Sequence, residues 1–165
     1  MRCTIKDKIG GYIADVEEKD VIEYLQEDTI LTINGVGNVE WTSKLHRYFA
    51  SDCAEHVLPV WHIKYTNDDI LVKAIAASRA YAVGEITLEE MEAVGNEVLA
   101  LADDLAKDPI YGCCAYVAYA VADSCGVGPY CAGASAHAAT HASSDIRAEI
   151  AWQLNRLKYY IKLNK

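Results

Sequence analysis

The chain has 165 residues, and 52% of them are hydrophobic, which is enough apolar sequence for one folded domain and too much for a disordered chain. Its formal net charge of −9 argues against binding to nucleic acid or to an anionic membrane, because both are negatively charged themselves. We interpret residues 1–165 as a single domain, in which an N-terminal extension (1–40) precedes a helical bundle (41–162).

The N-terminal 40 residues carry the weakest pattern of the chain. Lys19 to Gln26 shows a short helical spacing of apolar residues. The run T-I-L-T-I is followed by Asn34-Gly35, a dipeptide typical of the tight turn of a β-hairpin. One small β-hairpin is therefore the only strand structure that we expect in an otherwise all-α protein.

From Trp41 to Ile161 apolar residues recur every three or four positions, which predicts a series of amphipathic helices. The expected helices cover residues 41–63, 68–83, 87–107, 109–124, 130–142 and 146–161. Pro59 is expected to kink or restart the first of them, and Gly84 to end the second in a left-handed conformation. Thr87 and Glu90 fit a capping box at the start of the third. Five or six helices with short connections predict an all-α bundle.

The third helix is strongly acidic. Residues 85–123 contain nine acidic residues against Lys107 alone. The apolar stripe from Leu88 to Leu105 must face the core, so the acidic side chains must face outward. The exposed candidates for binding a basic protein partner are Glu89, Glu92, Glu97, Asp103 and Asp104. The alternative is that these charges form a solvated face and nothing more.

The six cysteines include no C-x-x-C pair, and the first residues lack the apolar core of a signal peptide. We therefore expect a cytoplasmic protein with buried, reduced thiols and no membrane span. Cys125 and Cys131 flank a G-V-G-P turn and could approach each other, so a disulfide between them stays open. Phosphate-binding and dinucleotide-binding glycine motifs are absent from the sequence, and no cofactor is expected.

Two histidines, His137 and His141, stand four residues apart on one expected helix, a spacing that lets two imidazoles share a metal ion. The glutamate expected beside the first histidine is replaced by Ala138. A third ligand, His56 or Cys53, would have to come from another helix. Helix-packing histidines are the more common meaning of this pattern, and we expect no metal.

Asp52 and His56 lie one helical turn apart near the middle of an apolar face. A carboxylate and an imidazole at this spacing can pair directly. Burial of both groups is costly unless each is hydrogen-bonded, which favours a structural polar pair over a catalytic dyad. No nucleophile motif accompanies them.

Three stretches carry a resemblance to a known family. They are D-C-A-E-H-V-L-P (52–59), K-A-I-A-A-S-R-A-Y-A-V-G-E-I-T-L-E-E (73–90) and A-H-A-A-T-H-A (136–142). Together they resemble the immunity proteins of bacterial polymorphic toxin systems, in particular the immunity-five-like group, over roughly residues 45–142. The resemblance implies an all-α cytoplasmic protein that protects its producer by binding a toxin, with no catalytic residues.

Three hypotheses follow. The first is a non-catalytic immunity protein that inhibits a basic toxin or effector by direct binding. The second is an inhibitor of a host defence protein, encoded by a phage or another mobile element. The third, of a different class, is a metal-dependent enzyme that uses His137, His141 and either His56 or Asp52.

Overall fold

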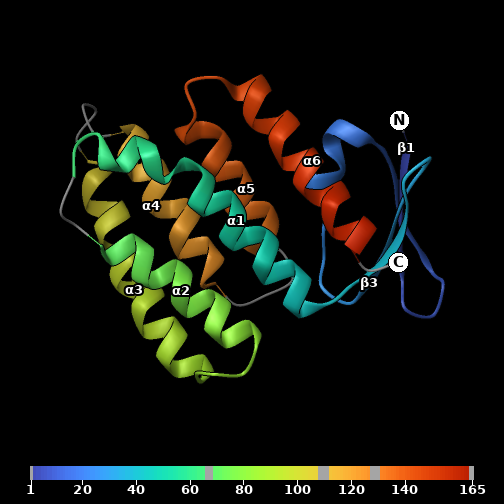
Figure 1. The fold of residues 1–165 in the computed structure, drawn as a ribbon, viewed down its shortest axis with the longest axis horizontal. Coiled ribbons are helices and arrows are strands. Elements are labelled where there is room, and N and C mark those ends of the chain that lie inside the picture. Colours follow the sequence, from blue (N-terminus) through green and yellow to red (C-terminus); the bar gives the residue numbers. More distant parts are fainter. Residues whose placement is uncertain (1, 66–68, 108–111, 127–130, 164–165) are drawn as a thin grey trace.

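A computed structural model describes residues 2–65, 69–107, 112–126 and 131–163 (Figure 1). The N-terminal elements are β1 (Arg2–Asp7), β2 (Tyr12–Glu17), the 3-10 helix η1 (Glu18–Tyr24), β3 (Thr29–Ile33) and β4 (Gly37–Trp41). The helices are α1 (Ser43–His62), α2 (Ile70–Ala82), α3 (Leu88–Leu105), α4 (Gly112–Ser124), α5 (Cys131–Ala142) and α6 (Ile146–Leu163). The protein is therefore mostly helical, as predicted.

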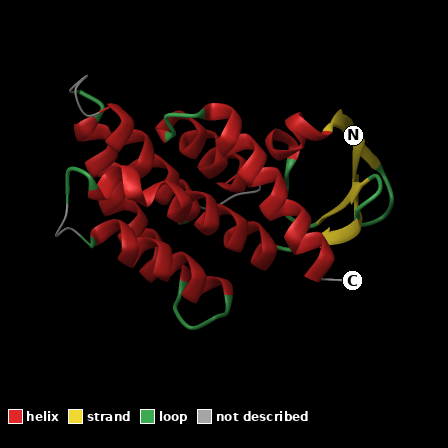
Figure 2. Cartoon of the chain, turned by 45° about the horizontal axis from the view of Figure 1, so that its top comes forward, coloured by secondary structure: helices red, strands yellow, loops and turns green. Residues whose placement is uncertain are grey.

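The N-terminal part is more than the small hairpin that we expected. It forms a four-stranded antiparallel sheet in the order β2-β1-β3-β4, at one end of the molecule (Figure 2). The turn at Asn34-Gly35 joins β3 to β4 as predicted, and Gly35 has a φ of 79°. The prediction missed the first hairpin, because β1 and β2 have only six residues each and neither alternates strictly between apolar and polar side chains. The short helical pattern at Lys19 became a 3-10 helix.

The sheet packs one face against the end of α6. Its buried side chains include Ile5, Leu31 and Trp41, which belong to the same core as Leu157 and Ile161 of α6. Figure 1 shows α6 lying between the sheet and the remaining helices. The sheet is thus attached to the bundle mainly through its last helix.

Helix α1 packs against α2, α4 and α5. It begins directly after β4, where the hydroxyl of Thr42 accepts a hydrogen bond from the amide of Leu45 (3.3 Å). Pro59, which was expected to kink or restart this helix, does not restart it. The residue lies in the last turn, and the helix continues to His62.

The predicted helix ends are present where the structure describes them. Gly84 has a φ of 77°, and its amide donates to the carbonyl of Tyr81. Thr87 and Glu90 form the complete capping box, which lowers the pKa of the Glu90 carboxyl. The carboxylate of Asp145 accepts from two amides in the first turn of α6. The expected helix start at 109–111 lies outside the described residues, as does Tyr130.

Helices α4 and α5 have the smallest side chains and lie deep in the bundle. Alanines make up most of their buried residues, and the hydroxyl of Ser135 shares its one hydrogen between the carbonyls of Ala50 and Ala120 (2.9 and 2.8 Å). These contacts satisfy a buried hydroxyl where two helix backbones lie close together. None of the described helices combines the length and the hydropathy needed to cross a bilayer.

Candidate interaction surface

Asp52 stands where α1, α2 and α6 meet, with its side chain 7% exposed. One carboxylate oxygen accepts from Nη2 of Arg79 on α2 (2.8 Å). The other accepts from Nε of Arg156 on α6 (2.5 Å) and from the hydroxyl of Tyr160. Burial, reinforced by the Asp52 charge, raises the pKa of Tyr160. Both oxygens are thus occupied, which supports a structural role for Asp52.

His56 is bound to α6 as well, through a different residue. Its Nδ1 lies 2.7 Å from Oε2 of Glu149, whose side chain is only 2% exposed. Gln153 donates to the other oxygen of Glu149 (2.9 Å), and the ring of Trp152 stacks on the imidazole at 3.8 Å. The side chains of Asp52 and His56 make no hydrogen bond with each other in the part of the chain that the structure describes. The two side chains expected to pair with each other instead each tie α1 to α6.

The acidic side chains of α3 face outward. Met91, Gly95, Val98 and Ala102 form the buried side of the helix. Leu88, at the end of the predicted apolar stripe, is 39% exposed. Four of the predicted partner-binding residues are exposed, namely Glu89, Glu97, Asp103 and Asp104, and the fifth, Glu92, is half-buried. Acidic residues along one exposed helix produce a negative surface that attracts cationic proteins.

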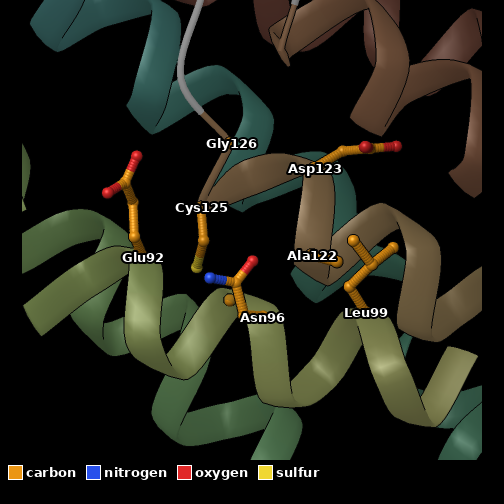
Figure 3. Close-up of a pocket in the computed structure, with 8 residues that line it drawn as sticks. Glu92, Asn96, Leu99, Ala122, Asp123, Cys125 and Gly126 are labelled. Carbon is orange, nitrogen blue, oxygen red and sulfur yellow. The ribbon is translucent and has the colours of Figure 1, made fainter. Parts of the chain in front are cut away.

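A cleft of about 270 Å³ opens between α3 and the end of α4 (Figure 3). The helices cross closely here, since a Cβ on Gly95 would lie 2.7 Å from Cβ of Cys125. Figure 3 shows Glu92 and Asp123 at opposite sides of the cleft. Burial raises the pKa of Asp123 to about 6 and that of Cys125 to about 11. The thiol of Cys125 therefore stays protonated and is a poor nucleophile at neutral pH.

The cysteines considered for a disulfide are both free. Cys125 donates its thiol hydrogen to the carbonyl of Ala74 (3.2 Å), and burial raises the pKa of Cys131 to about 11. They behave as small buried side chains.

The histidines considered as metal ligands do not form a site with a third ligand among the described residues. His137 and His141 are exposed neighbours on α5, with ring centroids 4.6 Å apart. His56 is engaged by Glu149. In the described part of the chain, the only group of three potential ligands in mutual reach is Glu27, His46 and Cys131.

The sequence did not single out this second group, because its members come from a loop, α1 and α5. Nδ1 of the buried His46 faces the indole N–H of Trp41, and Nε2 faces the amide N–H of Ala132, both at 3.0 Å. A neutral imidazole has one free lone pair, so only one of these contacts is a hydrogen bond at a time. Burial lowers the pKa of His46 to about 4. A metal ion would have to displace a donor that already faces the ring, which supports a structural role.

A family model described as "Imm-5 like putative immunity protein" matches residues 44–160. The match runs from α1 to α6 and leaves the N-terminal sheet outside it. Comparison with curated proteins and with solved structures finds no match.

Proposed function

The chain belongs to the Imm-5-like immunity protein family, and we propose that it neutralises a toxin by direct binding in the cytoplasm of the cell that produces both. The proposal involves no catalytic step and no cofactor. The polar clusters around Asp52, His56 and His46 hold helices together. We therefore assign partner binding to an exposed surface.

The observation that carries the proposal is the uneven distribution of charge. Residues 80–146 contain ten of the 24 acidic residues but only one of the 15 basic residues, Lys107. This segment therefore has a net charge of −9, equal to that of the whole chain. The residues outside it contain equal numbers of acidic and basic side chains. Lys107 is itself 3.1 Å from Asp104.

A surface of this kind suits a basic partner. Exposed acids that lack cations of their own attract a positively charged protein and accelerate its association. A toxin that acts on nucleic acid has such a basic surface, and α3 would compete for it with the nucleic acid. The partner-binding residues of the proposal are Glu89, Glu92, Glu97, Asp103 and Asp104.

The test is protection of growth. The chain is co-expressed with the effector encoded in the neighbouring gene, and binding of the two purified proteins is followed by surface plasmon resonance. Replacing Glu89, Glu92 and Glu97 with lysine should slow association at least tenfold, because the local field then opposes the partner. Raising the salt concentration should slow the wild-type association in the same direction.

A matched control separates a local surface from overall charge. Lysine at Asp15, Glu23 and Glu40 changes the net charge equally, but at exposed positions on the N-terminal part. This variant should protect and associate like the wild type. An equal loss of association rate in both variants would mean that α3 has no special role. An effector that still kills cells in which the chain is co-expressed would overturn the proposal itself.

A further inference from the structure

Four rings form a continuous cluster on the α4–α5 surface, which we call the ring cluster: Tyr116, Tyr119, His137 and His141. Tyr116 is 41% exposed, and its ring stacks on His141 with centroids 5.0 Å apart and planes at 24°. His137 packs edge-on against His141, and Tyr119 lies 6.5 Å from Tyr116. Exposed tyrosines supply rigid contact area at little entropic cost, which is why they are enriched at protein interfaces.

The ring cluster is joined to carboxylates on both sides. The hydroxyl of Tyr119 donates to Oδ1 of Asp103 on α3 (2.7 Å), across the α3–α4 contact. On the other side, the charge of His137 acts on Asp123 and lowers the pKa of that carboxyl, against the larger effect of burial. Helix α4 lies between α3 and α5 (Figure 1), so the acidic face of α3 and the ring cluster form one surface.

The α4–α5 part of this surface has no permanently charged cation of its own. Neither α4 nor α5 contains a lysine or an arginine. The carboxylate of Asp123 makes no hydrogen bond and no ion pair with another described residue, and burial raises its pKa to about 6. A half-buried carboxylate without a cation is stabilised when a positive group is brought beside it.

Elsewhere in the molecule, tyrosine rings already bind arginine side chains. The guanidinium of Arg156 lies 4.8 and 5.2 Å from the ring centroids of Tyr159 and Tyr160, and it also donates to Asp52. Arg47 stacks on Tyr81 at 4.7 Å. In the ring cluster, carboxylates likewise lie beside aromatic rings, but no arginine of α4 or α5 stacks on them.

We propose that the ring cluster is the recognition centre for an arginine side chain of the basic partner. The guanidinium would stack on the side of the Tyr116 ring that His141 does not cover, and the charges of Asp103 and Asp123 would attract it to this surface. Arginine suits this site better than lysine, because its planar group stacks on rings and is less strongly hydrated. This inference rests on the proposed function and names the residues that would dominate the interface.

The first test uses a probe that needs no partner. The full-length protein is titrated with N-acetyl-arginine N-methylamide while the ring and amide resonances are followed by NMR. Saturable shifts are expected at Tyr116, Tyr119 and His141, with a dissociation constant in the millimolar range. The citrulline analogue, which is uncharged and nearly isosteric, should cause no saturable shift. Equal shifts with both probes would overturn charge recognition at this site.

Variants then assign the binding to the ring. Tyr116→Ala should weaken arginine binding roughly threefold to fivefold, the range expected for one exposed cation–π contact. Tyr116→Phe keeps the ring and should bind within about twofold of the wild type. Tyr24→Ala is the matched control, because Tyr24 is also 41% exposed but lies on η1. An equal loss with Tyr24→Ala, or no loss with Tyr116→Ala at unchanged melting temperature, would overturn the proposal.

The toxin complex separates this inference from the function on which it rests. In the complex, Tyr116→Ala should raise the dissociation constant at least tenfold, and Tyr116→Phe should restore most of the affinity. Loss of toxin binding by the α3 lysine variant together with unchanged binding by Tyr116→Ala would overturn the ring cluster alone. Arginine-probe binding that depends on Tyr116, in a chain that does not protect against the toxin, would instead overturn the toxin function and leave the arginine site standing.

Discussion

Two regions of the molecule handle charge in opposite ways. Between α1, α2 and α6, the buried acids are matched by partners: Asp52 by Arg79 and Arg156, and Glu149 by the imidazole of His56. The segment 80–146, which contains α3, α4 and α5, has ten acidic residues and only one lysine. Asp52 and Glu149 are buried, whereas most of the described acids in that segment are exposed.

The difference follows from the cost of desolvation. A carboxylate removed from water costs several kcal/mol unless a cation and hydrogen bonds replace its hydration, so matched charges are required where helices meet. An exposed carboxylate keeps its hydration, so an unmatched one costs the fold little. Unmatched exposed charge thus remains free for a partner, whereas matched buried charge is committed to the fold.

The largest effect is expected at the matched site. Asp52→Ala leaves Arg79 and Arg156 without their shared carboxylate and should lower the free energy of unfolding by about 2–4 kcal/mol. Urea denaturation measures this change. Asp104→Ala is the matched control, because Asp104 also has an ion-pair partner but is exposed, and its loss should be about 0.5 kcal/mol or less. Equal losses of unfolding free energy in the two variants would contradict the proposed difference between matched buried acids and exposed acids.

An intermediate effect is expected at Asp123, the half-buried carboxylate on the unmatched side. Its pKa rises from 3.8 to about 6 on folding, mainly through burial, so the native state binds more protons than the unfolded state between these values. Asp123 therefore costs stability as the pH rises from about 4 to about 6. Asp123→Asn should remove that loss.

The difference between variant and wild type isolates this residue from other titrating groups. We expect Asp123→Asn to be of similar stability to the wild type at pH 4 and more stable by about 1–3 kcal/mol at pH 7. Urea denaturation across this pH range measures it. A stability difference that is independent of pH would show that Asp123 is well solvated, and would place it among the freely exposed acids.

The smallest effect is expected on the exposed side of α3. Lysine at Glu89, Glu92 and Glu97 should change the free energy of unfolding by about 0.5 kcal/mol or less per site, because Glu89 and Glu97 are exposed, Glu92 is only half-buried, and hydrated charges contribute little to stability. The melting temperature, measured beside the association rate, checks this expectation. A large loss of stability would mean that these acids hold α3 in place, and the same variant could no longer report on a partner surface.

Much of the helical part follows from local sequence. The capping box at Thr87, the left-handed Gly84 and the cap at Asp145 act within a few residues of their own positions, so their patterns can be read directly. The outward orientation of the α3 acids follows from helical periodicity for the same reason. Pro59 was expected to kink or restart α1, but the helix continues past it to His62, and the following Trp61 is fully buried in the core.

The sequence by itself determined the helical periods, their caps, the Asn34-Gly35 turn and the concentration of negative charge. Only the tertiary structure decided the rest. The sheet depends on β1, which pairs with β2 on one side and β3 on the other, and no local pattern contains both partners. Asp52 and His56 were identified as polar residues on an apolar face, but their partners on α6 lie about a hundred residues away. The ring cluster likewise gathers residues of α4 and α5, because side-chain neighbourhoods across helices are set by packing and not by spacing along the chain.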